Sequence, residues 1–340
     1  MSVDSERSNV VLRSPGEFAA AVPALLGFHP KGSLVAVFLR EGRILVTMRV
    51  DLPEDLEDFA GHATGVAFRV GADEVVVAVY CPRGHGALPH QEGVDALIDA
   101  FEDGGVVVKD ALLINAGRYW SYACLSAQCC PPEGVPMPES HVLEAERVGA
   151  GMPAVASDRD AVIVRYQPRP DLAASPQLLA QAAAILQVPV VERARQCWDE
   201  VRMLAANPSV PGNAGALMRA RLQVAMGDVR VRDFVMASIA ASDAGVEALT
   251  DVVVQAALTA PVELRPRIAG AAAALLAGSD GSSIAVDCLL DLAGDESLAD
   301  LVRISQQIPT PPTTLRAMFA SAMPMVQQQL RRAGKEAIAE

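Results

Sequence analysis

Aromatic residues and lysines are both scarce in this 340-residue chain. Phe, Trp and Tyr together make up 4% of the sequence, and the only lysines are Lys31, Lys109 and Lys335. A core with so few aromatic rings consists mainly of Ala, Val and Leu, which favours close helix–helix contact through small side chains. With three lysines, Schiff-base or phosphate chemistry through a lysine amine has few candidate residues.

Long apolar segments are missing too. The longest such run, from Ala269 to Ala277, is rich in alanine and contains Gly270, and it falls well short of the ~18 residues of a transmembrane helix. Residues 1–11 are polar and lack the apolar core of a secretory signal peptide. We therefore expect a soluble cytoplasmic protein with no membrane partner, whose six cysteines stay reduced and form no disulfide framework.

Positive charge is in deficit, because 28 Lys and Arg face 41 Asp and Glu and give a net charge of −13. Binding to nucleic acid or to anionic lipid draws on clustered Lys and Arg. The densest basic stretch, Arg193 to Arg232, is interleaved with acidic residues, which is typical of a solvated helical face. The sequence therefore argues against a nucleic-acid partner.

Common enzyme motifs are also absent from the sequence. It has no Gly-x-x-x-x-Gly-Lys-Ser/Thr phosphate loop, no His-Glu-x-x-His metal motif and no Gly-x-Ser-x-Gly nucleophile elbow. These motifs are strong sequence signals for nucleotide, metal-assisted and acyl-transfer chemistry. Without them no reaction can be assigned, and the balance favours a protein that is not an enzyme.

The first half of the chain has the pattern of an α/β domain. Ser14, Pro15 and Glu17 form a capping box, which predicts a helix that begins at Pro15 and ends at Gly27. Alternating and Val-rich runs then predict a hairpin and three further strands, over 33–40, 43–52, 74–81, 106–115 and 117–125. Helical patterns cover 54–70 and 91–103. Strands that alternate with helices after a hairpin predict a mixed sheet with helices packed on it.

The second half has the pattern of an all-helical domain. Gly and Pro separate helices predicted over 190–206, 214–226, 230–241, 246–258, 266–276, 282–292, 297–307, 313–322 and 325–339. The spacing resembles a paired-helix array, although no sequence repeat is found. Pro168 and Pro170 mark the junction, so we place an α/β domain at 1–168 and a helical-array domain at 169–340.

Cys124, Cys129 and Cys130 form the segment with the most chemical potential. Three thiols within seven residues could bind zinc, although the usual Cys-x2-Cys knuckle is missing. They could also form a redox pair between Cys124 and either neighbour, since so short a loop can bring the two Cα atoms within disulfide range. The simplest alternative is that these thiols only pack against the end of the sheet.

Cys81, His85 and His90 are candidates for a fourth zinc ligand. They lie at or just after the end of a predicted buried strand, where α/β sheets often place ligands. The glycines on either side of His85 make this loop flexible, which is equally typical of an ordinary surface connection.

His29, Arg49 and Asp51 are weak candidates for a catalytic or polar site. Arg49 and Asp51 fall two residues apart on one face of a predicted strand, so they could form an ion pair beside His29. The simpler interpretation is an exposed pair that contributes at most ~1 kcal/mol.

Several motifs, in the same order along the chain, resemble an actinobacterial family known as domain of unknown function 4192. They are Ser14-Pro15, Val22-Pro23-Ala24-Leu25-Leu26-Gly27-Phe28-His29-Pro30, Ser33-Leu34-Val35, Arg49-Val50-Asp51-Leu52-Pro53, Trp120-Ser121-Tyr122 with Cys124, Cys129-Cys130-Pro131-Pro132-Glu133-Gly134 and Asp280-Gly281. The family tends to carry Gly-Asp-Gly at the last position, whereas Ser279 stands first here. The resemblance implies an actinobacterial source and common ancestry, and it implies no activity.

Three functions of different classes follow from these features. The first is a non-enzymatic protein-interaction or regulatory scaffold, with the helical half as the partner-binding part. The second is an enzyme with a pocket at the sheet edge of the first domain. The third is a redox or metal sensor that uses Cys124, Cys129 and Cys130, with zinc as the candidate metal.

Overall fold

The structure is a computed structural model that describes residues 12–339, apart from 54–55, 85, 125, 127, 150–151, 209, 211, 280–281 and 308–309. The chain divides into two compact units, Met1–Arg159 and Asp160–Glu340, here called the α/β unit and the helical unit. Pro168, at the junction expected from the sequence, lies a short way into the helical unit.

The first helix, α1 (Pro15–Leu26), begins and ends where its sequence predicts. The Ser14 Oγ accepts a hydrogen bond from the Glu17 N–H at 3.2 Å, while a Glu17 carboxylate oxygen accepts from the Arg13 N–H at 2.7 Å. These contacts satisfy N–H groups that have no partner inside the helix. Gly27 ends the helix in the left-handed region at φ 81°, which glycine adopts without steric cost.

The mixed sheet predicted for this unit is confirmed, with strand order β2-β1-β3-β4-β5-β6. It has six strands where the sequence predicted five, because the short β6 was not expected, and the strand predicted over 117–125 ends at Ser121. Its strands are β1 (Ser33–Arg40), β2 (Arg43–Asp51), β3 (Glu74–Tyr80), β4 (Val107–Asn115), β5 (Arg118–Ser121) and β6 (Val135–Pro136). β3 and β4 pair in parallel and the other neighbours pair antiparallel. Both residues of the β1–β2 turn, Glu41 and Gly42, have positive φ, which matches the twist of a tight hairpin.

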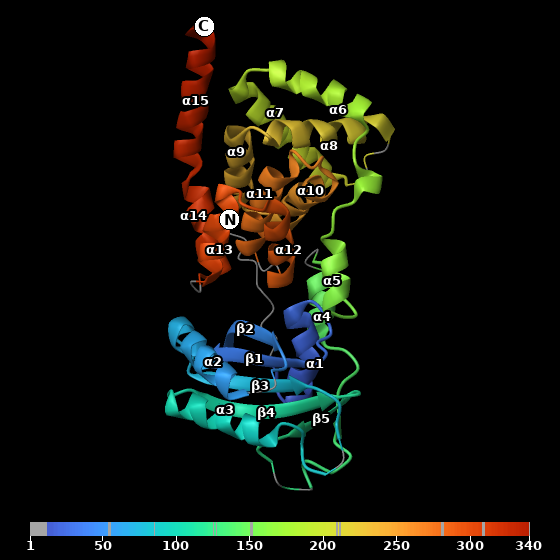
Figure 1. Cartoon of the computed structure of the whole chain (residues 1–340), viewed down its shortest axis with the longest axis vertical. Coiled ribbons are helices and arrows are strands. Elements are labelled where there is room, and N and C mark those ends of the chain that lie inside the picture. The colour runs from blue at the N-terminus through green and yellow to red at the C-terminus, as the bar shows by residue number, and fades with distance from the viewer. Residues whose placement is uncertain are drawn as a thin grey trace, which may run out of the picture. The chain divides into compact units, whose positions relative to one another are not determined.

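Helices cover the two faces of the sheet unequally (Figure 1). On one face, α2 (Leu56–Val70) and α3 (Gln91–Asp103) pack over a core in which the Phe38 and Phe101 rings meet edge to face at 5.9 Å. On the other face, α1 supplies Phe18 and Val22 to a smaller core. The last helix of this unit is α4 (Val142–Gly149), and α5 (Arg159–Arg165) begins at the division between the units; the sequence left the run 162–164 open between helix and strand.

The predicted all-helical second half is also confirmed. Its main helices are α6 (Pro176–Ala182), α7 (Val190–Ala206), α8 (Gly212–Met226), α9 (Val229–Ala240), α10 (Val246–Thr259), α11 (Arg265–Ala277), α12 (Ser283–Ala293), α13 (Ser297–Gln307), α14 (Pro312–Ser321) and α15 (Met323–Ala339). As the shortage of aromatics predicts, α11 buries a run of alanines against its neighbours. None of the helices within the described ranges is long and apolar enough to cross a membrane.

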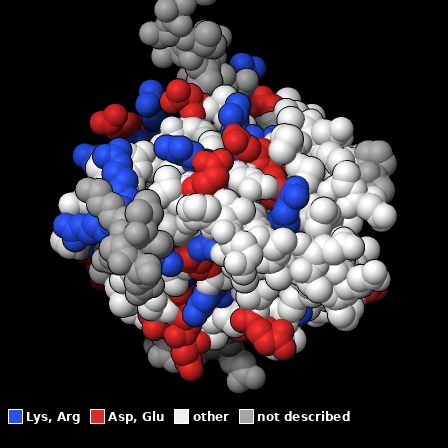
Figure 2. All heavy atoms as spheres, turned by 90° about the horizontal axis from the view of Figure 1, so that it is seen from above, with Lys and Arg blue, Asp and Glu red and all other residues white. Residues whose placement is uncertain are grey.

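Arginines of the helical unit stabilise the carboxyl ends of other helical segments. Their guanidinium groups donate to terminal carbonyl oxygens: Arg193 to Leu186, Arg265 to Ala260, Arg303 to Leu290 and Gly294, and Arg316 to Ala240. A cation there satisfies unpaired carbonyls and opposes the negative end of the helix dipole. Three arginines of the basic stretch, Arg193, Arg221 and Arg232, have acidic partners, and the face in Figure 2 shows both signs of charge interspersed.

Candidate functional site

The loop after β5 brings three thiols together. The Sγ atoms of Cys124, Cys129 and Cys130 all lie within 4.8 Å of one another, and those of Cys124 and Cys129 are 2.7 Å apart. Cys129 is exposed, while Cys124 and Cys130 are half-buried. These three residues are called the thiol cluster below.

A tight turn places Cys129 opposite Cys124. The backbone N–H groups of Cys129 and Cys130 both donate to the Ser126 carbonyl, at 3.2 and 2.9 Å. The Cys129 thiol also lies 3.5 Å from this carbonyl oxygen, within hydrogen-bond range for sulfur. Because the chain turns back on itself here, two cysteines five positions apart in the sequence have adjacent sulfur atoms.

The second half of the loop is fixed to β5. The Trp120 Nε1 donates to the Pro132 carbonyl at 3.0 Å, and Arg118 donates to the Gly134 carbonyl at 2.7 Å. Gly134 has φ 79°, and a Cβ at this position would lie 2.5 Å from the Trp120 ring, so only glycine fits. The segment that follows the thiol cluster is therefore held against β5.

Tyr119 of β5 lies near the thiol cluster and near the half-buried Asp110 of β4. The Asp110 carboxylate accepts hydrogen bonds from the Ser121 hydroxyl at 2.7 Å and from the Ala111 N–H at 2.9 Å. Burial raises the pKa of Asp110, although these hydrogen bonds oppose the shift. Burial also raises the pKa of Tyr119, and the negative charges of Cys130, Asp110 and Cys129 raise it further. Tyr119 therefore lies close enough to the thiol cluster for a thiolate there to disfavour its ionisation.

Of the residues expected to supply a fourth zinc ligand, Cys81 and His90 lie outside the close group that the thiol cluster forms. Cys81 packs against the core near Tyr122, and burial raises the pKa of its thiol. His90 is exposed at the start of α3, and His85 falls outside the described residues. In the part of the chain that the structure describes, the close group of candidate ligands consists of the three cysteines alone.

Arg49 and Asp51 form an ion pair, with Nη2 and Oδ1 2.6 Å apart. Arg49 also donates two hydrogen bonds to the Ser33 Oγ, at 3.0 and 2.7 Å, and is largely buried by them, whereas the Asp51 side chain is exposed. His29 is exposed, and its backbone N–H donates to the Ala156 carbonyl at 3.0 Å. Arg49 thus joins the edge strand β2 to its neighbour β1. The sequence offered one signal for its partner, a serine that opens an otherwise apolar strand.

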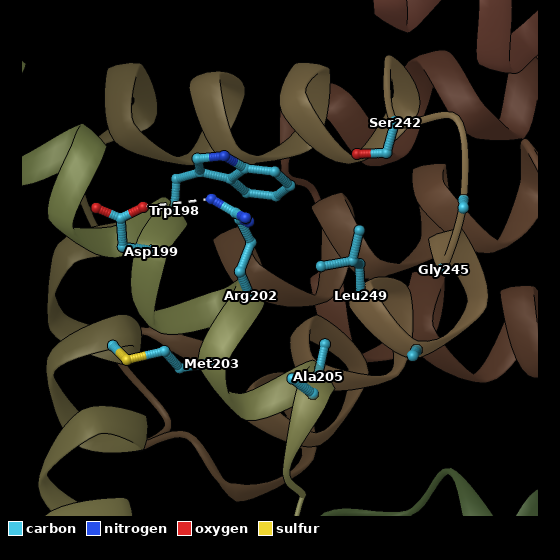
Figure 3. A pocket seen from close by; sticks show the side chains of 11 residues that line it. Trp198, Asp199, Arg202, Met203, Ala205, Ser242, Gly245 and Leu249 are labelled. Carbon is cyan, nitrogen blue, oxygen red and sulfur yellow. Dashed lines mark ion pairs between the residues drawn. The ribbon is translucent and has the colours of Figure 1, made fainter.

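A groove in the helical unit was not expected from the sequence. It has a volume of about 740 Å³ and lies between α7 and the start of α10, with Trp198, Arg202, Met203 and Leu249 in its lining. In Figure 3, Trp198, Arg202 and Leu249 face the same space. Its two walls lie about forty residues apart in the sequence, so only the packing of α7 against α10 reveals it.

Comparisons with known proteins give one match. The family model described as "Domain of unknown function (DUF4192)" matches residues 15–312 of the chain. No curated protein and no solved structure matches it.

Proposed function

Because this chain belongs to the family described as a domain of unknown function (DUF4192), whose description gives no activity, we propose a function from the site itself. The protein is a thiol redox sensor in which Cys124 and Cys129 form a reversible disulfide. The observation that carries this proposal is the separation of 2.7 Å between the two sulfur atoms.

The sulfur positions favour a disulfide over zinc as the product of this cluster. The Cys124–Cys129 separation of 2.7 Å lies between the about 2.05 Å of a disulfide bond and the about 3.8 Å between two thiolates on one tetrahedral zinc, and it is nearer to the former. The described residues around the cluster also supply three ligands of the four that a structural zinc site needs. Zinc could still bind through three thiols and a water, so the experiment below includes it.

The proposed step uses a hydroperoxide as the oxidant. The thiolate of Cys129, the exposed member, attacks the peroxide, so that an S–O bond forms and the O–O bond breaks. The leaving oxygen takes a proton and departs as alcohol or water. The Cys124 thiol then attacks the sulfenic sulfur, the S–S bond forms, and the second oxygen departs as water. Two thiols lose two hydrogens in total, and exchange with a cellular thiol restores them.

The test uses full-length reduced protein treated with hydrogen peroxide, followed by alkylation of free thiols and mass spectrometry. We expect a loss of two hydrogens that maps to Cys124 and Cys129 and is reversed by a thiol reductant. Cys124→Ser and Cys129→Ser should both abolish this loss. Cys288→Ser is the matched control, because it removes a half-buried cysteine of the helical unit and should change nothing.

Other outcomes would contradict the proposal. Native mass spectrometry with added zinc should show no tightly held ion; a stoichiometric zinc ion lost on Cys130→Ser would make the cluster a metal sensor instead. Thiols that remain unchanged under peroxide and bind no zinc would leave the cluster with a packing role only.

The redox proposal includes a cytoplasmic location, because a reversible thiol pair needs a compartment that returns it to the reduced state. An actinobacterial origin, which the motif resemblance implies, is part of the same proposal.

We infer a second candidate function, binding of a partner protein, from the groove between α7 and α10. Its lining includes Trp198, Arg202 and Met203, and these three residue types are enriched at protein interfaces. Arg202 lies 3.9 Å from Asp199 in an exposed ion pair that contributes little, so its guanidinium is available to a partner. The fitting partner is a short segment with apolar side chains and a carboxylate.

A library of displayed random peptides, selected on the full-length protein, tests this second function. We expect enrichment of peptides with apolar and acidic residues, and binding about tenfold weaker to Trp198→Ala and Arg202→Ala. Arg331→Ala, an exposed arginine of α15, is the matched control. If no sequence is enriched, or if both groove variants bind as the wild type does, the groove is not a binding site.

A further inference from the structure

The two edges of the sheet differ in a way that singles out β2. At one edge, β6 has two residues and ends in Pro136, which has no backbone N–H to offer a new strand. At the other edge, β2 has nine residues, pairs with β1 on one side and contains neither proline nor lysine. Short strands, prolines and edge lysines are the usual protection against pairing with another chain. β2 has none of these three, although it carries charged residues and its pairing with β1 is irregular next to Leu45.

The apolar row of β2 is incompletely covered. Val46, Met48 and Val50 face the core beneath α2, yet all three remain half-exposed, whereas the equivalent residues of β1 are fully buried. Figure 1 shows β2 at the margin of the sheet, so among the described residues this row has strand neighbours on one side only. A further strand at this edge would bury it.

We propose that β2 is the contact between two copies of this chain, which pair antiparallel through their β2 edges about a two-fold axis. Pairing of this kind satisfies the free backbone groups of both strands at once and joins the two sheets into one. The occupant is a second copy because the sequence of β2 complements itself.

The register follows from the shape of the strand. Pairing of β1 with β2 is irregular next to Leu45, so the regular part of β2 runs from Val46 to Asp51, and its apolar residues Val46, Met48 and Val50 are centred on Met48. With Met48 on the axis, Val46 of one copy faces Val50 of the other on the core side. The apolar rows of both copies then become continuous beneath α2.

Charge does not oppose this register. On the face away from α2, Thr47 of one copy faces Arg49 of the other, and each Arg49 is already neutralised by Asp51 of its own strand at 2.6 Å. No two like charges stand directly opposite each other, although the chain as a whole carries −13. A lysine or arginine substituted at position 47 would add positive charge opposite Arg49 of the other copy.

The test is sedimentation velocity of the full-length protein over a range of concentrations. We expect a wild-type dimer, and dissociation about tenfold easier for Thr47→Lys, because a lysine on an edge strand opposes pairing with a second chain. Val107→Lys is the matched control: it places the same charge on an exposed position of β4, away from this edge, and should leave the dimer unchanged. Circular dichroism checks that both variants fold.

A cross-link tests the register itself. Met48→Cys places two thiols on the proposed axis, where facing Cβ atoms lie about 5 Å apart, so mild oxidation should join two copies through this residue. A wild-type protein that stays monomeric at every concentration would overturn the proposal. So would a dimer that neither weakens with Thr47→Lys nor cross-links through position 48.

Discussion

The α/β unit and the helical unit differ in what their polar side chains do. In the helical unit, buried charges meet partners: Arg193 pairs with Asp228 at 2.7 Å, and Arg221 pairs with Glu200 at 2.6 Å. The α/β unit also holds partnered polar groups, such as Arg49, but it differs in carrying the thiol cluster, of which Cys129 is exposed. Polar residues of the helical unit mainly maintain its architecture, so the α/β unit is the better place to look for chemistry. The predictions below test this contrast.

The largest expected effect is in the helical unit, at Arg193. The side chains of Arg193 and Asp228 are 9% and 15% exposed, and Arg193 also donates to the Leu186 carbonyl. Arg193→Leu should lower the free energy of unfolding by about 3–5 kcal/mol, because it leaves a buried carboxylate with one partner fewer. Arg195→Leu on the same helix is the control: its ion pair with Glu192 is 3.9 Å long and exposed. Chemical denaturation measures both, and equal effects would contradict the contrast.

Gly134 of the α/β unit should give the next largest effect. Gly134→Ala forces a Cβ against the Trp120 ring and places alanine at φ 79°, so we expect a loss of about 2–4 kcal/mol. Gly117→Ala is the control, because Gly117 has φ 73° with open space around it. This variant should lose only the free energy of placing alanine in the left-handed region. Thermal unfolding followed by Trp fluorescence compares them. A similar loss for both variants would mean that the ring contact stabilises nothing.

Glu200 should make the stability of the helical unit depend on pH. Burial raises its pKa from an ordinary value of 4.5 to about 7, although Arg221 opposes the shift. Between these values the native protein binds more protons than the unfolded chain, so its stability falls as pH rises. Glu200→Gln should remove up to about 3 kcal/mol of this fall between pH 5 and pH 8. Denaturation at the two pH values measures it, and equal slopes in both proteins would refute it.

The smallest expected effect concerns the start of α1. Ser14→Ala removes the hydrogen bond to the Glu17 N–H and should cost about 1 kcal/mol. Ser282→Ala is the control, because Ser282 occupies the same position before α12 without a side-chain cap. Its loss should be close to zero by the same denaturation measurement. If the two serines cost the same, the cap contact in α1 is not stabilising.

Much of the fold could be predicted because local signals set the ends of its elements. The bounds of α3 and α7 agree with the sequence patterns, since His90 and Gly104 bracket one and Pro189 and Asn207 the other. The run 162–164 resisted assignment, because three adjacent β-branched residues fit a short strand as well as a short helix.

The candidate site was predictable only where it is local in sequence. Cys124 and Cys129 are joined by a short loop, so their proximity follows from chain length. His90 and Cys81 were candidates because they follow the end of a strand, but nothing in the sequence reports how far a loop turns. The groove beside Trp198 and the free edge of β2 depend on tertiary packing and strand order, which have no local signature.

The arginine contacts at helix ends have a consequence for how the helical unit opens. Arg316 of α14 donates to the Ala240 carbonyl at the end of α9, and Arg303 of α13 holds the end of α12 in the same way. The carboxyl end of α9 or α12 can therefore fray only if it breaks its hydrogen bond to an arginine side chain of a different helix. The last turn of α9 should therefore exchange its amide hydrogens only when α14 detaches, so that distant helices share one opening event.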